Sequence, residues 1–284
     1  MEKISNKFYT GERSLFHSEN LQLDNCEFGE GESPLKESRD IELANCKFGW
    51  KYPLWYGKNF TVSNCYFAET ARAGVWYTEN VAFKNVKIDA PKQLRRCRGV
   101  TLEKVDFNLA HETLWACDGV KMNEVTALEG DYFAMNSRNM EINGLTLHGN
   151  YSFDGAQNVT IRSSKIYSKD AFWNSKNVTV TDSFIEGEYL GWNAENLTLI
   201  NCTVASHQGM CYIKNLVMKN CKVTNTDLAF EYSSVNATLT GKVDSVKNPA
   251  SGKIEAEEIG ELIMEKDKVD ASATEIIAGG KRIN

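Results

Sequence analysis

A nine-residue pattern recurs along the chain at intervals of 19 to 21 residues. It reads NLQLDNCEF from Asn20, NFTVSNCYF from Asn59 and NVTVTDSFI from Asn177. Internal repetition of this length is the signature of a solenoid, in which each repeat packs only against its neighbours. The repeats begin at Asn20, Asp40, Asn59, Asn80, Gly99, Gly119, Asn139, Asn158, Asn177, Asn196 and Asn215, and a shorter copy, NATLTGKV, begins at Asn236.

Each repeat alternates apolar and polar residues, which is typical of a β-strand with one buried face. Polar residues between the short strands, and Asn, Asp or Gly at each start, indicate bends because these types tolerate left-handed backbone angles. A leucine-rich repeat needs a helical half, which these copies lack. Variable coil length favours the right-handed form over the strict hexapeptide type. The sequence therefore predicts an all-β fold, a single-stranded right-handed parallel β-helix of about 11–12 coils with 19–21 residues per coil.

Coils such as NVTVTDSFI resemble those of the pectate-lyase-like right-handed parallel β-helix superfamily. The NC-x-F coils, combined with the segments LWYGKN and GVWYTEN, make the chain similar to an uncharacterised bacterial family, domain of unknown function 3737. The resemblance extends over nearly the whole chain. It implies the fold, and it implies no known activity.

The repeats also suggest how the chain is organised. Residues 1–12 precede the first coil and are expected to cap its open end. The parallel β-helix is expected over residues 13–243. Residues 244–284 lose the aromatic pattern, and we expect a degraded final coil or a C-terminal cap of the same domain.

Composition excludes several classes of partner. A net charge of −6 and a pI of about 5.4 argue against nucleic acid, whose phosphates require a basic face. No segment approaches the roughly 18 apolar residues of a membrane helix, and no export signal precedes the first repeat. We therefore expect a cytoplasmic protein that binds neither nucleic acid nor membrane. The eight cysteines show no CxxC spacing, so we expect no disulfide, no metal and no cofactor.

Aligned repeats place equivalent residues in columns. Cys26, Cys46 and Cys65 share a column with valine and leucine of other repeats, which predicts a core position. Bend residues such as Asn64 are expected to form a hydrogen-bonded ladder. The residue before each repeat is mostly charged, with both signs present, which predicts a solvated row of ion pairs.

One column, four residues before each repeat, contains five of the six tryptophans. It comprises Trp55, Trp76, Arg95, Trp115, Met135, Asp154, Trp173, Trp192 and Cys211, and the column beside it begins with Tyr56 and Tyr77. The preceding column is apolar, so we expect this one to point outward. Three interpretations stay open: a flat platform for a sugar chain, a surface covered by residues 244–284 or a second chain, and an inward core. On the platform, Arg95 would stack between Trp76 and Trp115.

We therefore expect a carbohydrate-binding or recognition protein whose partner is a glycan or a sugar-containing small molecule. The predicted ligand contacts are Trp55, Trp76, Arg95, Trp115, Trp173, Trp192, Tyr56 and Tyr77. One alternative is a scaffold that self-associates into a homo-oligomer through the aromatic column. The other is a polysaccharide lyase or hydrolase, which needs clustered carboxylates and basic partners. The sequence does not fix catalytic residues, and the candidates are Asp154, Arg95, Arg96 and His111.

Overall fold

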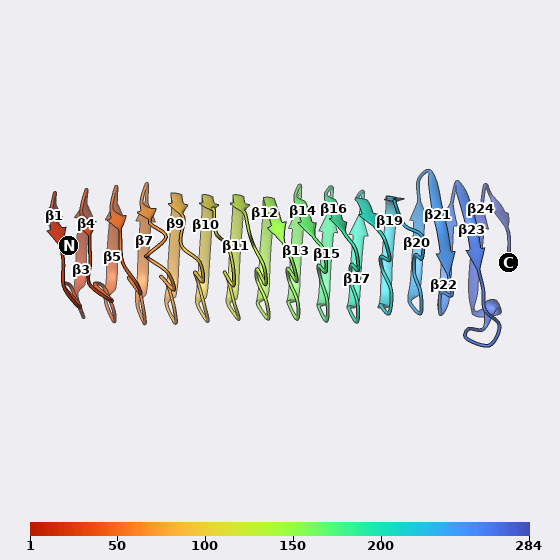
Figure 1. The fold of residues 1–284 in the computed structure, drawn as a ribbon, viewed down its shortest axis with the longest axis horizontal. Helices are drawn as coiled ribbons and strands as arrows, with labels where there is room; N and C mark the ends of the chain where they lie inside the picture. The colour runs from red at the N-terminus through yellow and green to blue at the C-terminus, as the bar shows by residue number, and fades with distance from the viewer. The chain divides into compact units, whose positions relative to one another are not determined.

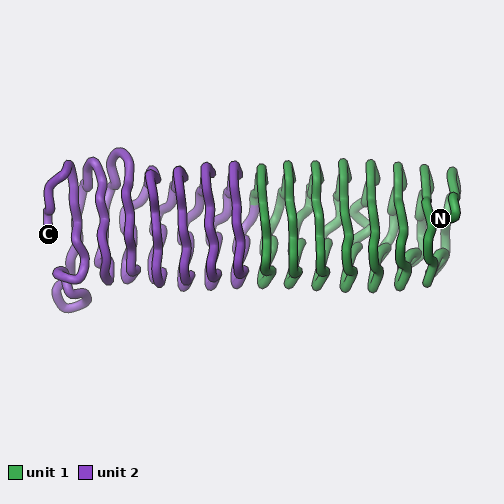
Figure 2. Tube along the Cα trace, turned by 180° about the vertical axis from the view of Figure 1, so that it is seen from behind, with its two compact units in different colours: residues 1–148 green, residues 149–284 purple.

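The computed structural model describes residues 1–284. Contacts between Cα atoms group the chain into two compact units, residues 1–148 and residues 149–284 (Figure 2). Each unit is a right-handed parallel β-helix, as the repeats predicted. The chain contains about 15 coils of about 19 residues, more than the 11–12 coils expected from the sequence. We call one coil of either unit a rung.

In residues 1–148, successive strands pair in parallel with the strand one repeat further along the chain (Figure 1). The long strands are β1 (Glu2–Ser5), β3 (Glu19–Asp24), β5 (Arg39–Ala44), β7 (Lys58–Ser63), β9 (Glu79–Ile88), β10 (Arg98–Phe107), β11 (Asp118–Ala127) and β12 (Arg138–Gly149). A second row of short strands comprises β2 (Phe8–Tyr9), β4 (Glu27–Phe28), β6 (Lys47–Phe48) and β8 (Tyr66–Phe67). In β9, β10, β11 and β12 one continuous strand spans both rows, and β7 and β8 accordingly both pair with β9.

Residues 149–284 repeat this arrangement. Its first strands are β13 (Gln157–Arg162), β14 (Lys165–Ser168), β15 (Lys176–Thr181), β16 (Phe184–Gly187), β17 (Glu195–Ile200), β18 (Thr203–Ser206) and β19 (Lys214–Thr224). The last part comprises β20 (Ser234–Leu239), β21 (Lys242–Lys247), β22 (Ser251–Ala256), β23 (Glu258–Ile263), the short 3₁₀ helix η1 (Ala271–Ala273), β24 (Thr274–Ala278) and β25 (Lys281–Arg282).

Both segments outside the predicted coils form strands. Within residues 1–12, β1 and β2 pair in parallel with β3 and β4. Within residues 244–284, β22 pairs with β20, and β24 pairs with β22. This last segment therefore adds rungs to its own unit, and β25 runs antiparallel along β24.

The core lies inside the rungs, where equivalent side chains stack from one rung to the next. The rings of Phe28 and Phe48 stack at 4.8 Å, and those of Phe48 and Phe67 at 4.6 Å. Cys26, Cys46 and Cys65 are buried, which confirms the predicted core column, and the other five cysteines are free and buried as well. Cys211, which the alignment placed in the tryptophan column, is 0% exposed, so the expectation that this column points outward is wrong at that position. Burial is also the main reason that the pKa of Cys211 rises to about 12.

Two ladders of polar side chains follow the bends. The bend residues Asn64 and Asn85 have positive φ angles, and Asn85 Nδ2 donates to Asn64 Oδ1 at 3.3 Å. A second ladder joins the residues that open each repeat. In residues 149–284, Asn177 Nδ2 donates to Asn158 Oδ1 at 2.9 Å, and Asn196 Nδ2 donates to Asn177 Oδ1 at 2.8 Å. We call this second ladder the opening ladder.

The charged row is present as predicted. Arg39 pairs with Glu19, Arg138 with Asp118 at 2.9 Å, and Lys214 with Glu195 at 3.3 Å. No helix in the structure is long and apolar enough to cross a membrane.

Candidate functional site

The tryptophan column of residues 1–148 points outward. Trp55, Trp76 and Trp115 are half-buried, whereas Leu54 and Leu114 beside two of them are 0% exposed. The inward-core interpretation is therefore wrong, because the apolar column takes that place.

The rings in this column stack face to face. The Trp55 and Trp76 centroids lie 5.0 Å apart with planes 7° from parallel. The Arg95 guanidinium lies 4.7 Å from the centre of the Trp76 ring and 4.9 Å from that of Trp115, which confirms the predicted cation–π sandwich. We call this stack, together with Tyr56 and Tyr77 beside it, the aromatic ladder.

This stacking decides what the aromatic ladder offers to a ligand. Sugar rings lie on aromatic faces, but the facing sides of Trp55 and Trp76 cover each other. Tyr56 and Tyr77 stack in the same way, at 4.8 Å and 6°. The indole nitrogens of the two tryptophans are also engaged: Trp55 Nε1 donates to the Ala73 carbonyl at 2.5 Å and Trp76 Nε1 to the Lys92 carbonyl at 2.8 Å. The expectation of a flat platform is therefore wrong here, and the ladder presents ring edges.

Residues 149–284 contain a second stack. Trp173 and Trp192 lie 5.4 Å apart with planes 12° from parallel, and Tyr212 contacts Trp192 edge-on at 5.1 Å with planes 61° apart. Trp173 Nε1 donates to the Tyr189 carbonyl at 2.5 Å. Here too the faces meet each other within the protein.

The four catalytic candidates do not form a shared site within either unit. Asp154 belongs to residues 149–284, where its Oδ1 accepts from Asn174 Nδ2 at 2.8 Å. Arg95 is bound to Glu112 at 2.6 Å. His111 lies 3.8 Å from a carboxylate oxygen of Glu129 and 3.9 Å from one of Asp131. Arg96 is exposed.

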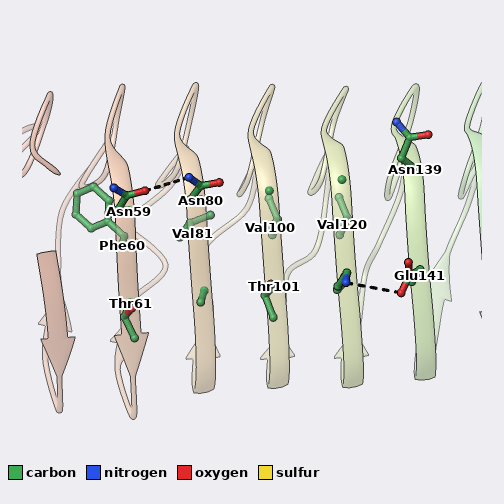
Figure 3. Close-up of a pocket in the computed structure, with 14 residues that line it drawn as sticks. Asn59, Phe60, Thr61, Asn80, Val81, Val100, Thr101, Val120, Asn139 and Glu141 are labelled. Carbon is green, nitrogen blue, oxygen red and sulfur yellow. Dashed lines mark hydrogen bonds and ion pairs between the residues drawn. The ribbon is translucent and has the colours of Figure 1, made fainter. Parts of the chain in front are cut away.

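A groove crosses β7, β9, β10, β11 and β12 on the outer face of residues 1–148 (Figure 3). It has a volume of about 640 Å³. Its lining includes Asn59, Thr61, Asn80, Ala82, Gly99, Thr101, Gly119, Lys121, Asn139 and Glu141. Hydroxyl, amide and charged groups therefore share one open surface, and Lys121 and Glu141 approach to 4.0 Å across it.

The groove coincides with a gap in the opening ladder. Asn59 Nδ2 donates to Asp40 Oδ1 at 2.8 Å, and Asn80 Nδ2 donates to Asn59 Oδ1 at 3.0 Å. The next two positions are Gly99 and Gly119, which have no amide to continue the ladder. In the repeat pattern these glycines stand only as bend residues, and the sequence did not predict the groove.

Backbone sterics do not require glycine at position 119. A Cβ atom there would lie 3.7 Å from the nearest atom, which is an ordinary contact. The φ angle is +72°, and asparagine adopts 57° at position 139 of the same ladder. At position 99, a Cβ would come within 2.7 Å of Asn80 Oδ1, the end of a side chain that can rotate.

The gap also costs stability. A ladder hydrogen bond contributes about 0.5–1.5 kcal/mol net, and Gly99 and Gly119 have no side chain to form one. Their φ angles of +67° and +72° are ones that glycine adopts without strain. The two glycines therefore keep the bend but leave out the ladder bond, and the surface above them stays open.

The family assignment rests on the sequence as a whole. The family described as protein of unknown function (DUF3737) matches residues 2–277. The chain belongs to this family. No curated protein matches the chain. The DUF3737 description assigns no activity.

Proposed function

We propose that residues 1–148 of this protein bind a carbohydrate chain in the groove over β7–β12. Five strands spaced about 4.8 Å apart extend the groove over ~19 Å, which suits a chain of sugar units better than one small molecule. The Thr61 and Thr101 hydroxyls and the Asn80 amide line it, so both donors and acceptors are available. Sugar hydroxyls also donate and accept, and they match such a surface.

The observation that carries this proposal is the gap at Gly99 and Gly119. In the complete part of the ladder, each amide oxygen accepts from the next rung. No residue on β10 donates to Asn80 in this way, because position 99 is glycine. A sugar hydroxyl lying over Gly99 would take the place of the absent amide and donate to Asn80 Oδ1.

The aromatic ladder has a supporting part in this proposal. Its stacked rings and the Arg95 sandwich stiffen the turn that precedes the groove strands. A ligand would contact the aromatic ladder through the ring edges of Trp55, Trp76, Trp115, Tyr56 or Tyr77. The same holds for the ring edges of Trp173 and Trp192. We keep a cytoplasmic location as part of the proposal, which favours intracellular sugar metabolites or glycan precursors as ligands.

Binding to a glycan array tests the proposal. We expect the wild-type chain to bind a subset of oligosaccharides, and Gly119→Asn to weaken that binding at least tenfold by filling the groove. Gly144→Asn is the matched control: Gly144 also has a positive φ of 68°, and it lies outside the groove. Equal binding by the wild type and Gly119→Asn would contradict the groove. Absence of any binding, together with oligomers broken by Trp76→Ala, would favour self-association instead.

A further inference from the structure

A second, smaller hollow lies beside the groove, above Ala116. It has a volume of about 330 Å³. Its lining comprises Arg96, Cys97, Arg98, Ala116, Cys117, Asp118, Asn136 and Arg138. The hollow exists because its column carries the large residues Tyr56, Tyr77 and Arg96 and then a single methyl group at Ala116 before Asn136. Since Cys97 and Cys117 are buried, they form the floor.

The charges around this hollow are unbalanced. Three arginines and one carboxylate line it. Arg138 Nη2 is bound to Asp118 Oδ2 at 2.9 Å, whereas Arg96 and Arg98 form no ion pair within 4.0 Å. Both of these arginines are exposed. Two guanidinium groups with free donors therefore face one site.

The Asp118 carboxylate already accepts hydrogen bonds from two neighbouring side chains. Its Oδ1 accepts from Asn139 Nδ2 at 2.7 Å in addition to the bond from Arg138. These bonds, with the Arg138 bond foremost, lower the pKa of Asp118, and the nearby charge of Arg98 adds to the effect. A bound anion would be repelled by this carboxylate and attracted by the three arginines.

The hollow and the groove share a border. Arg98 lies next to Gly99, Asp118 next to Gly119 and Arg138 next to Asn139, and each pair puts one residue in each lining. A ligand in the groove therefore needs only a short substituent to reach the hollow.

We propose that the ligand of the groove carries a phosphate or sulfate group, and that Arg96, Arg98 and Arg138, with Asn136, hold this group above Ala116. This inference rests on the proposed carbohydrate-binding function. Arg96 and Arg98 reach the hollow from the rung before Ala116, and Asn136 and Arg138 reach it from the rung after, so donors lie on both sides of the site. A tetrahedral oxyanion presents three oxygens in different directions and matches such an arrangement, whereas a planar carboxylate presents two.

The first test uses inorganic sulfate and inorganic phosphate with the full chain. We expect either ion to shift the amide resonance of Ala116 in an NMR titration, with Arg96→Ala weakening the binding at least tenfold. Ala116→Tyr should abolish it, since tyrosine occupies the same column at Tyr56 and Tyr77 with similar φ angles of 55° and 57°. Arg72→Ala, which removes an exposed arginine outside the hollow, is the control. A titration without saturable shifts, or with equal affinity in Arg96→Ala, overturns the proposal.

The second test separates this inference from the proposed function. Oligosaccharides with one backbone are compared in neutral, phosphorylated, sulfated and uronate forms. We expect the phosphorylated or sulfated form to bind at least tenfold more tightly than the neutral parent, and Arg96→Ala to remove this difference while neutral binding persists.

Equal affinity for all forms, with Gly119→Asn still weakening each, would overturn the oxyanion site and leave carbohydrate binding standing. A preference for the uronate form would overturn the tetrahedral assignment. Binding of inorganic ions without any oligosaccharide would support the hollow and overturn the proposed function.

Discussion

The side-chain amide of Asn139 donates to Asp118 Oδ1 at 2.7 Å. Asp118 lies one position before Gly119, the position that would accept this bond in a complete opening ladder. In complete parts of the ladder the acceptor is the opening residue of the previous rung, as Asn158 is for Asn177. The repeat on β11 opens at Gly119, which offers no side chain. One missing side chain thus opens the floor of the groove and leaves Asp118 as the acceptor that binds both Asn139 and Arg138.

We predict that Gly119→Asn stabilises the fold while it impairs ligand binding. Gly99 offers the new amide no acceptor, and Asn139 already donates to Asp118, so the variant forms no additional ladder bond. The lost flexibility of glycine lowers the entropy of the unfolded chain, and we expect a gain of about 0.4–1 kcal/mol. Chemical denaturation measures this. Gly144→Asn, with the same change of residue, should gain a similar amount. A destabilised Gly119→Asn variant would show that glycine is needed there for the backbone.

The reverse change should weaken an unbroken part of the ladder. Asn177 both donates to Asn158 and accepts from Asn196, so Asn177→Gly removes two bonds. We expect a loss of about 1–3 kcal/mol in the free energy of unfolding, measured by urea denaturation. Unchanged stability would mean that the ladder contributes little, and that Gly99 and Gly119 cost the fold no ladder stabilisation.

Trp76→Ala should affect stability more than ligand binding. The change removes one face of the Arg95 sandwich, the stack on Trp55 and the bond to the Lys92 carbonyl. Because Trp76 is half-buried, we expect a cost of about 2–4 kcal/mol, near the lower end for large core residues. Glycan affinity of the folded variant should stay within threefold of the wild type. Lost affinity with unchanged stability would restore the aromatic ladder as the binding surface.

Asp170 should make stability fall with rising pH. Its side chain is 3% exposed, its Oδ1 has no hydrogen-bond partner, and desolvation raises its pKa, with Lys169 opposing and Glu188 adding to the shift. The folded state therefore holds the proton more tightly, and stability decreases as pH rises from the ordinary aspartate value of about 3.9 to the raised value.

Asp170→Asn isolates this effect. The variant should be more stable than the wild type at neutral pH, and the difference should shrink as the pH approaches about 4. Denaturation curves across that range provide the measurement. A constant difference at every pH would assign the effect to packing and not to the charge.

The cysteines should be inert in the native state. All eight are buried, so a reagent has no access to them in the folded state. Burial raises the pKa of Cys211 to about 12, whereas a hydrogen bond with the Cys202 side chain lowers the pKa of Cys221 to about 7, so the lack of access and not the pKa protects the thiols. We expect no reaction with an aromatic disulfide reagent at neutral pH until the chain unfolds, and then eight equivalents. Rapid labelling of one thiol in the folded protein would place that cysteine at the surface.

Much of the fold could be predicted because a β-helix repeats one local arrangement. The spacing of the copies identified the strands, and exchange of Cys65 with valine in other copies identified a core column. The Arg95 sandwich followed from the same alignment, since neighbouring rungs bring column members into contact. The alignment placed the start of the last, shorter repeat wrongly, because that repeat is irregular. The shorter copy was placed from Asn236, but Leu216 pairs with Val235, so Ser234 is the residue equivalent to Asn215.

The site was harder to predict, for two physical reasons. Outward-pointing columns do not specify ring orientation, and rungs about 4.8 Å apart leave room for stacked rings but not for a ligand between them. The groove depends on side chains that are missing at Gly99 and Gly119, and a search for chemically active residues overlooks glycine. The usable signal was the replacement of asparagine by glycine in two consecutive copies.

The pairing of each strand with the strand one repeat away has a kinetic consequence. Paired residues such as Val81 and Val100, or Leu197 and Leu216, are about 20 positions apart, which is short for an all-β protein. Closing such loops costs little entropy, so folding can nucleate at any rung and then extend one rung at a time. Within each unit, slow nucleation should then be followed by rapid zippering, and the free energy of unfolding should grow with the number of rungs.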